Sequence, residues 1–583
     1  MMGAAANLAW LACNAPGHAR FVRALREPAA TQSRLLLKCL RANSGTAYGR
    51  EHHLDRIRSV AEFQDVVPLA TYDDLEPWIE RIARGEPRVL TNEPVLRLVP
   101  SSGSTAAAKR IPYTATMKRQ VRRAVAPWVF DLYRNRLRLA SGSCYWSITP
   151  PAMVIEEASS APVAVGYEED GEYLGGIVKR LADATMAVPA AVRRVRRIES
   201  FRYVTLRFLL QRSDLSVISV WHPSFLTLLM DELPRIWSRL LWDLERGTLD
   251  PPGDLDPRSR EALSPHLKAL PRRARELKRV DPADWGRIWT RLGLVSCWGD
   301  GHAAMHCRDL ERRLPGVEIQ SKGLMATEGC VTIPLGGFSP LAVRSHFFEF
   351  LPVGDDARPD ARPLLAHELE RGALYSVVLT TGGGLYRYQL GDIVRAEGQV
   401  DDTPSLRFVG RHSCDSDLRG EKLCEAFVAC VLDKVLTGVT AHPEFAMLAP
   451  DTPAGGPGVP PSYTLYIECA SPHPAGLAGM LERGLRENPH YRACVELGQL
   501  RPARVFEIAG DAVGRYFEHC RRGGWRLGDI KPLALSPNDG WSRVFRGRYV
   551  DEENVPRAVA PLPAIRGAAR SGSRSVGSSD GTS

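Results

Sequence analysis

Strands and helices are predicted to alternate through residues 140–300, and this alternation restricts the fold more than any other feature of the sequence. Leu215–Val220 has the apolar pattern of a buried strand, and helical patterns follow over Phe225–Leu233 and residues 235–246. Another apolar strand is predicted at Leu292–Trp298. Such alternation is typical of a parallel α/β sheet. Because ligands of these sheets bind at the carboxyl ends of the strands, the loops there are the first candidates for a site.

The N-terminal segment is predicted to be mainly helical. Apolar residues at helical spacing indicate helices over residues 15–45, over a segment through Ile79 that ends near Gly85, and over residues 114–137. Asp73 is in a position to cap the helix that contains Ile79.

The chain has 583 residues, which is too long for one hydrophobic core, so two domains are predicted. The polar stretch Ser413–Arg419 has the composition of a hinge, and a smaller α+β unit with a helix over Glu421–Leu436 follows it. Gly and Ser predominate after about Arg566, as they do in disordered tails. The predicted boundaries are 1–412 for a large α/β domain, 413–565 for a small mobile α+β domain and 566–583 for the tail.

The composition indicates a soluble cytoplasmic protein. The chain has 44% hydrophobic and 25% charged residues, and its apolar stretches are too short to span a bilayer. Twelve cysteines without a Cys-x-x-Cys pair argue against zinc and redox motifs and suit a reducing compartment. Arginine runs such as Arg193–Arg197 are expected on solvated helix faces rather than against nucleic acid. The oligomeric state is not indicated.

The stretch from Ser101 to Lys109 has the chemistry of an anion-binding loop. It follows a predicted strand at Val95–Val99. Its first residues are hydroxyl-bearing or glycine: Ser101, Ser102, Gly103, Ser104 and Thr105. Bare backbone N–H groups and hydroxyls donate to phosphate oxygens, and Lys109 adds a compact positive charge. The stretch lacks the Gly-x-x-x-x-Gly-Lys pattern of the common nucleotide loop, so a Ser-rich surface turn is the alternative.

Four charged side chains elsewhere are candidates for the same site. A carboxylate beside a triphosphate needs a cation between them, so Glu328 of Thr327-Glu328-Gly329 is a candidate Mg²⁺ ligand. Asp392 lies in a mostly apolar strand context and is suited to accept sugar hydroxyls, and Arg411 is suited to bond the same sugar. Lys531, expected on an exposed loop of the small domain, is suited to neutralise charge near a reacting phosphate. Each of them has an ordinary role as its alternative, on the surface or in a turn.

Lysine is scarce in this chain, and the positions of the lysines support the choice of these candidate site residues. Only ten of the 76 basic residues are lysine. A lysine is therefore expected where a site needs a compact ammonium that a planar guanidinium cannot replace. Four of the ten lie in motifs that combine glycine with polar residues: Lys109, Lys322, Lys422 and Lys531.

In this order the motifs resemble those of the adenylate-forming enzymes. Within that superfamily the chain closely resembles the Gretchen Hagen (auxin-responsive) acyl acid amido synthetase family, from residue 15 to about residue 550. The resemblance rests on the hydroxyl-rich stretch and on these further motifs: Thr46-Ala47-Tyr48-Gly49, Val67-Pro68, Lys109-Arg110-Ile111-Pro112, Trp221-His222-Pro223-Ser224-Phe225-Leu226, Ala326-Thr327-Glu328-Gly329, Phe348-Glu349-Phe350, Leu385-Tyr386-Arg387-Tyr388, Gly391-Asp392 and Gly420-Glu421-Lys422-Leu423.

The resemblance implies an α/β adenylate-forming architecture, in which a hinge joins a large N-terminal domain to a small C-terminal one. It also implies a ligase that converts ATP to AMP and pyrophosphate. A carboxylic acid would react with the α-phosphate of Mg-ATP to give an acyl-adenylate. An amine, typically an amino acid, would then displace AMP to form an amide, with the small domain rotating between the two steps.

Carried over residue by residue, the resemblance implies the following roles: contact with the ATP phosphates for Ser101, Ser102, Gly103, Ser104, Thr105 and Lys109, a bond to the α-phosphate for Thr327, Mg²⁺ ligation for Glu328, ribose binding for Asp392 and Arg411, and service in the adenylation step for Lys531. Thr327 and Lys531 are thus the expected catalytic residues.

The chain departs from the family pattern at Ala106-Ala107-Ala108, where the superfamily loop has glycine after the threonine. The added methyl groups would restrict how closely the loop wraps the phosphates. Two alternatives stay open: an acyl-CoA ligase that uses the same adenylate step, and a catalytically silent relative that binds nucleotide. The acid and its acceptor are not identified, although Trp221, Phe225 and Phe348 are candidates for the acyl pocket, with a place in the core as their alternative.

Overall fold

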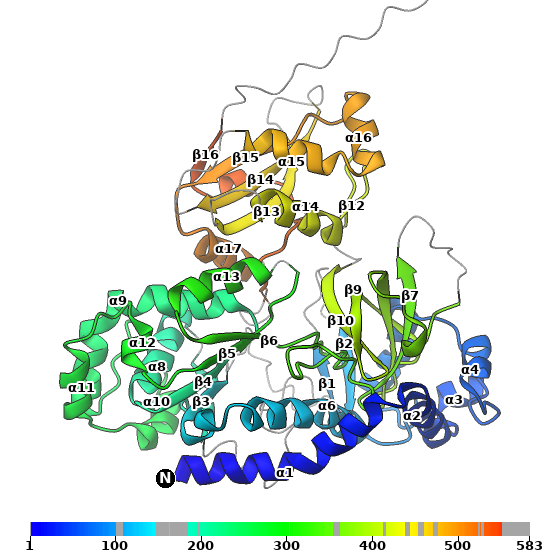
Figure 1. Ribbon diagram of the computed structural model, residues 1–583, viewed down its shortest axis with the longest axis horizontal. Coiled ribbons are helices and arrows are strands. Elements are labelled where there is room, and N and C mark those ends of the chain that lie inside the picture. Colours follow the sequence, from blue (N-terminus) through cyan, green and yellow to red (C-terminus); the bar gives the residue numbers. More distant parts are fainter. Residues whose placement is uncertain are drawn as a thin grey trace, which may run out of the picture.

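The fold is described from a computed structural model, which contains a large unit and a smaller unit above it in the view of Figure 1. The residues described are 2–100, 109–146, 163, 185–195, 197–301, 303–353, 362–411, 415–437, 443–452, 460–469, 476–522, 525 and 530–550. The predicted loop Ser101–Thr105, the alanines at 106–108, the start of the predicted hinge and the predicted tail lie outside them.

A parallel sheet forms one half of the large unit, in the strand order β3-β4-β5-β6. Its strands are β3 Ser143–Trp146, β4 Leu215–Ser219, β5 Leu294–Cys297 and β6 Glu318–Ser321. The helices around it are α8 Ile198–Leu210, α9 Pro223–Arg246, α10 Pro257–Leu263, α11 Pro271–Leu277, α12 Trp285–Ile288 and α13 Ala303–Arg313. Every residue of the middle strands β4 and β5 is buried, as expected for parallel strands. The α/β prediction is confirmed.

Helix α9 continues through Pro234, whereas the sequence predicted two helices separated there. An internal proline removes one backbone hydrogen bond and strains the preceding turn, at a cost of about 3 kcal/mol. One hydrophobic core takes up four leucines of α9, two on each side of the proline: Leu229, Leu233, Leu240 and Leu244. Each buried leucine contributes roughly 1.5–3 kcal/mol, so the continuous helix is favoured.

An antiparallel sheet forms the other half of the large unit, in the order β10-β9-β8-β7. Its strands are β7 Phe347–Val353, β8 Leu374–Thr380, β9 Tyr388–Val400 and β10 Thr403–Arg411. The N-terminal part contributes α1 Met2–Leu25, α2 Pro28–Asn43, α3 Ala47–Glu51, α4 Val60–Val66, α5 Tyr72–Ala83, the hairpin of β1 Val95–Pro100 with β2 Arg110–Thr114, and α6 Ala115–Arg134. These elements and the antiparallel sheet share one core.

Two details of the N-terminal helices differ from the predictions. The helix expected over residues 15–45 is divided in two, because Pro28 has no N–H to continue α1 and instead begins α2. The cap of α5 is Thr71, not Asp73: the backbone N–H and the hydroxyl of Thr71 both donate to the Asp74 carboxylate, at 2.8 and 2.7 Å. Asp74 stands three residues after the cap, which is the position that a capping box requires.

The small unit has a mixed sheet in the order β13-β14-β15-β16, in which only the β14–β15 pair is parallel. Its strands are β13 Pro443–Asp451, β14 Ser462–Cys469, β15 Arg504–Ile508 and β16 Gly547–Tyr549, with the short pair β11 Asp415–Ser416 and β12 Leu423–Cys424 beside α14. The helices are α14 Glu425–Thr437, α15 Leu477–Leu485, α16 Pro489–Glu496 and α17 Ala512–Arg522. Helix α14 thus begins four residues later than predicted, since β12 precedes it.

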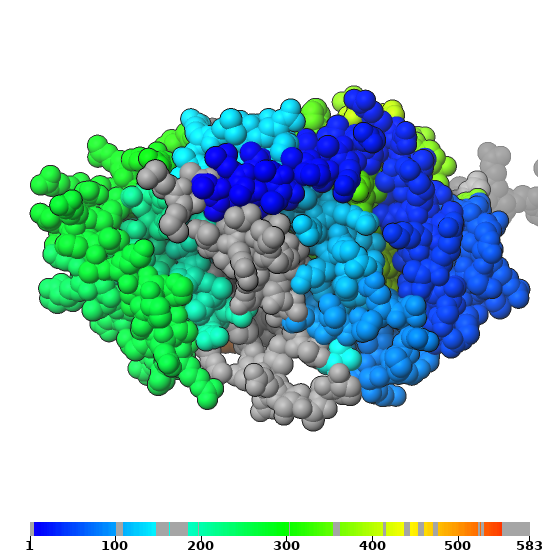
Figure 2. Space-filling model, turned by 90° about the horizontal axis from the view of Figure 1, so that it is seen from below, coloured from blue at the N-terminus to red at the C-terminus, as the bar shows by residue number. Residues whose placement is uncertain are grey.

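The two units meet through α14 and α13. A side chain at Gly410, near the end of β10, would come within 2.9 Å of the backbone nitrogen of Ala426, so the glycine lets α14 approach closely. Arg308 of α13 forms an ion pair with Asp433 of α14 at 3.5 Å. Figure 2 shows the opposite side of the large unit, where α1 lies across the face turned away from the small unit. Among the helices described, none combines the length and apolar character needed to cross a membrane.

Candidate active site

The antiparallel sheet brings Asp392 and Arg411 into contact. Asp392 lies on β9 and Arg411 ends β10, and the two residues are direct partners in the strand register. The Arg411 Nε donates to the Asp392 Oδ1 at 2.6 Å. The Asp392 side chain is 2% exposed and that of Arg411 is 26% exposed, so a carboxylate is held at the boundary between sheet and solvent.

Glu328 stands on a tight turn after the parallel sheet and faces the same charges. The backbone N–H of Gly329 donates to the Ala326 carbonyl at 3.2 Å, and the N–H of Ala326 donates to the Gly329 carbonyl at 3.0 Å. Burial raises the pKa of Glu328, and Asp392 raises it further, while Arg411 and Lys109 lower it. These electrostatic interactions place Glu328 close to three other predicted site residues. The alternative of an ordinary surface glutamate is excluded, because Glu328 is buried.

The turn that carries Glu328 needs a glycine at residue 329. A side chain there would come within 2.9 Å of the ring of His346, which lies just before β7. The ring of His346 is itself buried, and burial lowers its pKa to about 3. The turn therefore packs against a neutral, buried imidazole. Thr327, which precedes Glu328 in the turn, is half-buried.

Lys109 lies at the edge of the predicted phosphate loop. The strands on either side of the loop pair with each other, and Pro100 is opposite Arg110. The Lys109 ammonium lies 5.6 Å from the centre of the Tyr72 ring. Ser101 to Thr105 themselves are not described, so their predicted contact with phosphate stays a prediction.

Lys531 is not on an exposed loop, which corrects the expectation from the sequence. Its side chain is half-buried, and its ammonium lies 3.8 Å from the centre of the Trp298 ring. Trp298 directly follows β5, so the lysine of the small unit lies against the carboxyl end of the parallel sheet. An ammonium on an indole face is attracted by the negative face of the ring, and this attraction replaces part of the hydration that an exposed loop would provide.

The sequence did not point to Glu425, which the fold brings to the same site. Glu425 begins α14 and is buried, and its Oε1 accepts a hydrogen bond from the Ala534 N–H at 3.2 Å. Burial raises the pKa of Glu425, Arg411 and Lys531 lower it, and Asp392 raises it. No pattern around residue 425 distinguishes it from any glutamate in the first turn of a helix, so sequence alone had no signal for it.

The three aromatic residues proposed for the acyl pocket differ in how far they are buried. Phe348 is buried in the core of the antiparallel sheet, so it is a core residue and not part of an acyl pocket. Trp221 is half-exposed beside Trp298, with ring centres 5.3 Å apart, and the ammonium of Lys322 lies 4.5 Å from the Trp221 ring. Phe225 packs at the margin of the α9 core.

The donor set fits a nucleotide with a magnesium ion only if the ligand supplies part of the coordination. Among the residues described, no group of three or more metal-binding side chains occurs. Mg²⁺ commonly keeps waters and binds phosphate oxygens with one or two carboxylates. The buried carboxylate of Glu328, with cationic neighbours in Arg411 and Lys109, is compatible with that arrangement.

Comparison with protein families shows which family the chain belongs to. Family models match along most of its length: the GH3 family N-terminal domain at residues 17–319, the GH3 family central domain at 339–411 and the GH3 family C-terminal domain at 428–539. The chain belongs to the GH3 family. The resemblance stated from the motifs is thereby confirmed, while the predicted domain boundaries stay predictions.

Several curated relatives and solved structures resemble this GH3 chain. A probable indole-3-acetic acid-amido synthetase GH3.12 of Oryza sativa subsp. japonica is 26% identical, over 91% of this chain and 95% of the relative. The indole-3-acetic acid-amido synthetase GH3.8 of Oryza sativa subsp. indica is also 26% identical, over 92% and 89% of the two chains.

Among solved structures, the GH3.15 acyl acid amido synthetase matches this GH3 chain with a TM-score of 0.76 at 20% identity, over 91% of this chain and 95% of the other. The AtGH3.15 acyl acid amido synthetase in complex with 2,4-DB matches with a TM-score of 0.77 at 20% identity, over 89% and 93%. These matches confirm the predicted fold, with its large N-terminal and small C-terminal parts.

Proposed function

We propose that this GH3 protein is an acyl acid amido synthetase, which activates a carboxylic acid with ATP and transfers the acyl group to an amine. The observation that carries the proposal is one cluster of charges drawn from distant parts of the chain: Lys109, Glu328, Asp392, Arg411 and Lys531. Family membership supplies the reaction class, and the names of the relatives support an amino acid as the acceptor.

In the first step a carboxylate oxygen of the acid attacks the α-phosphorus of ATP. The bond to the bridging oxygen of the β-phosphate breaks, and pyrophosphate leaves with the electron pair. Asp392 and Arg411 would hold the ribose, Thr327 would donate to the α-phosphate, and Lys109 would contact the outer phosphates. A Mg²⁺ ion held by Glu328 would neutralise phosphate charge.

Lys531 would act on the charge that builds up between the acid and the α-phosphate. The ammonium of Lys531 rests on Trp298 at the strand ends of the large unit, so a short movement of the small unit would carry it to or from the reacting atoms. A preorganised cation at developing negative charge lowers a barrier more than a solvated one does.

In the second step the nitrogen of the amine attacks the carbonyl carbon of the acyl-adenylate. The carbon–oxygen bond to AMP breaks, AMP leaves with the electron pair, and the nitrogen loses a proton to give the amide. Use of an amine distinguishes the proposal from an acyl-CoA ligase, in which a thiol takes this place. A cytoplasmic location without nucleic-acid or membrane partners stays a prediction from the sequence.

The test is ATP–pyrophosphate exchange by the full-length protein with a panel of carboxylic acids, followed by mass spectrometry of products formed with a panel of amino acids. Acid-dependent exchange and amide products are expected. If no acid drives exchange, the silent-relative alternative replaces the proposal. If exchange occurs but only coenzyme A removes the acyl group, the acyl-CoA ligase replaces it.

A further inference from the structure

A cavity with many charged side chains in its walls lies in the large unit, between α1, α2 and α6. Its volume is about 700 Å³, and none of the predicted adenylation residues that the structure describes lines it. In Figure 1, α1 and α6 are on the side of the large unit away from the small unit. A cavity of this size accommodates a small organic ligand.

Positive side chains dominate the walls of this cavity. Seven cationic residues line it, against the two carboxylates of Glu27 and Glu93. The seven are Arg20, Arg23, Arg34, Lys38, Arg119, Arg123 and Arg344. Glu93 is already engaged, because it accepts hydrogen bonds from the N–H and hydroxyl of Thr116, at 2.8 and 2.7 Å, and from Arg119 at 2.8 Å. Glu27 lies 3.7 Å from Arg34.

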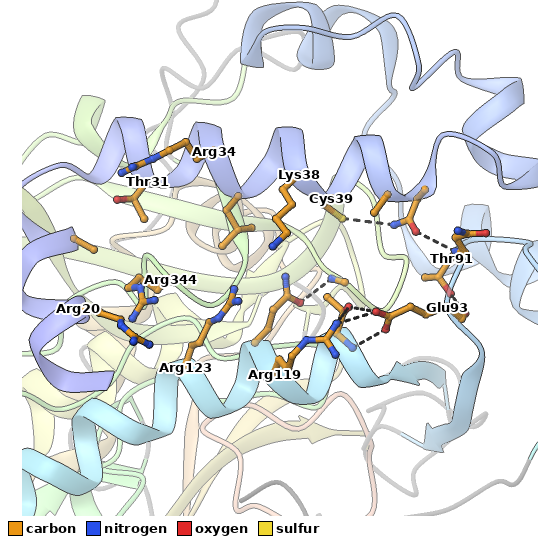
Figure 3. A pocket seen from close by; sticks show the side chains of 18 of the residues that line it. Arg20, Thr31, Arg34, Lys38, Cys39, Thr91, Glu93, Arg119, Arg123 and Arg344 are labelled. Carbon is orange, nitrogen blue, oxygen red and sulfur yellow. Dashed lines mark hydrogen bonds and ion pairs between the residues drawn. The ribbon is translucent and has the colours of Figure 1, made fainter. Parts of the chain in front are cut away.

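Three of the arginines come from different elements and gather at one end of the cavity. Arg20 lies on α1, Arg123 on α6 and Arg344 on the segment before β7, and Figure 3 shows the three side chains converging there. In the part of the chain that the structure describes, none of them has an acidic partner within 4 Å. The partial burial of Arg344 lowers its pKa, and Arg123 and Arg20 lower it further by repulsion. Like charges gathered in one place repel one another, and an anion between them would offset that repulsion.

The rest of the wall is held in place by internal hydrogen bonds. The Gln120 Oε1 accepts from the Gly382 N–H at 2.7 Å and lies 3.2 Å from the His346 Nδ1. Lys38 extends from α2 across the cavity from Arg123 (Figure 3). Cations therefore face the cavity from two sides, and hydrogen bonds hold the uncharged part of the wall between them in place.

We propose that this cavity binds a small molecule that carries two or more adjacent phosphate groups. Guanidinium groups match phosphate oxygens in pairs, whereas a single negative charge would leave most of the cluster uncompensated. Cations on several elements around one cavity can contact neighbouring phosphates together. The proposal does not depend on the proposed function, because the cavity shares no described residue with the adenylation site.

The test uses inorganic tripolyphosphate titrated into the full-length protein by calorimetry, at about 150 mM salt and with a chelator to remove Mg²⁺. The double variant Arg123→Ala/Arg344→Ala is expected to weaken binding at least about tenfold, because it removes two charge-assisted contacts. The matched control is Arg258→Ala/Arg272→Ala, which removes the same charge from exposed positions of α10 and α11 and is expected to bind as the unmodified protein does. Equal weakening in both double variants would show general charge attraction and overturn the proposal.

Two further arms of the experiment distinguish the cavity from the adenylation site and phosphate from carboxylate ligands. In Lys109→Ala the cavity binding is expected to persist, and its loss there, with the Arg123/Arg344 variant unaffected, would assign the anion to the adenylation site and refute the proposal. Citrate is expected to bind at least about tenfold more weakly than tripolyphosphate, and equal affinity would refute the phosphate assignment. If the double variant does not fold, Arg20→Ala on the exposed face of α1 serves in its place, with the same expected direction. Absence of tripolyphosphate binding by the unmodified protein also overturns the proposal.

Discussion

Two arginine–carboxylate pairs at the same antiparallel sheet, one of them just before β9 begins, have different surroundings. Arg387 and Glu349 are 5% and 1% exposed, and Nε and Nη2 of the arginine bond the carboxylate at 3.0–3.2 Å. Its Nη1 donates to the carbonyls of Gln64 and Val67 at 2.8 and 2.6 Å. Arg411 and Asp392 are 26% and 2% exposed, at the solvent edge of the sheet. Protein groups surround the first pair, as in a scaffold, whereas solvent or a ligand can reach the second.

The buried pair also explains two motifs that the sequence could only match to a family. Phe348-Glu349-Phe350 and Leu385-Tyr386-Arg387-Tyr388 meet through this pair, and Gln64 joins them by donating to Glu349 at 2.9 Å. Arg387 has a positive φ of 43°, which is uncommon for a residue with a side chain. The pair fixes the start of β9, and β9 in turn carries Asp392.

The largest expected effect is on stability, and it tests the buried Arg387–Glu349 pair. Arg387→Ala leaves the buried Glu349 carboxylate without its counter-charge, and we expect the free energy of unfolding to fall by about 3–5 kcal/mol. Urea denaturation followed by circular dichroism measures it. The control is Arg407→Ala, whose side chain is 54% exposed, and a loss of about 0–1 kcal/mol is expected there. Equal losses in the two variants would contradict the distinction.

The next effect concerns catalysis rather than stability. Lys531→Ala should lower the rate of ATP–pyrophosphate exchange by about 10²-fold, the scale of losing one preorganised charge-stabilising group. Stability should change by only about 0.5–1 kcal/mol, the worth of a cation–π contact. The control is Lys434→Ala, a small-unit lysine that is 66% exposed and paired with Glu487. Near-normal exchange by Lys531→Ala would remove this lysine from the mechanism.

A smaller effect, on ATP affinity, tests the more exposed Arg411–Asp392 pair. Asp392→Asn keeps the shape of the side chain and removes its charge, so we expect ATP to bind about tenfold more weakly, in line with the loss of a charge-assisted hydrogen bond. Calorimetry with ATP measures the dissociation constant. Glu397→Gln, on the same strand and 43% exposed, is expected to leave it unchanged. An unaltered affinity in Asp392→Asn would argue against a ribose contact.

The smallest effect is a pH dependence at Glu425, between the two units. Burial raises the pKa of Glu425 in the folded protein, so between its ordinary pKa and the raised one the folded state binds more protons than the unfolded state. Stability from this group is complete below the ordinary pKa and is lost as the pH rises through the raised pKa. Urea titrations across this range should show a decline in the unmodified protein relative to Glu425→Gln. A constant difference between them would contradict the shift.

The sequence predicted the main elements because their patterns are local. The strands β4 and β5 are apolar runs of the right length, and the strand predicted at Val95–Val99 is found as β1. The errors arose where neighbours in space decided the outcome. Leucines on both sides of Pro234 pack in one core, so α9 continues where two helices were predicted. Lys531 packs against the Trp298 ring and is half-buried, although it was predicted on an exposed loop.

The sequence by itself determined the α/β class and the family, since periodicity and the order of motifs are properties of the chain. The residues of the adenylation site stay a prediction. Only the tertiary structure decided which charges face one another. It separated the buried Arg387–Glu349 pair from the more exposed Arg411–Asp392 pair, brought Glu425 near the second pair, and gathered Arg20, Arg123 and Arg344 around one cavity. Burial and electrostatic interaction depend on distances across the fold, and residues hundreds of positions apart acquire those distances only when the chain packs.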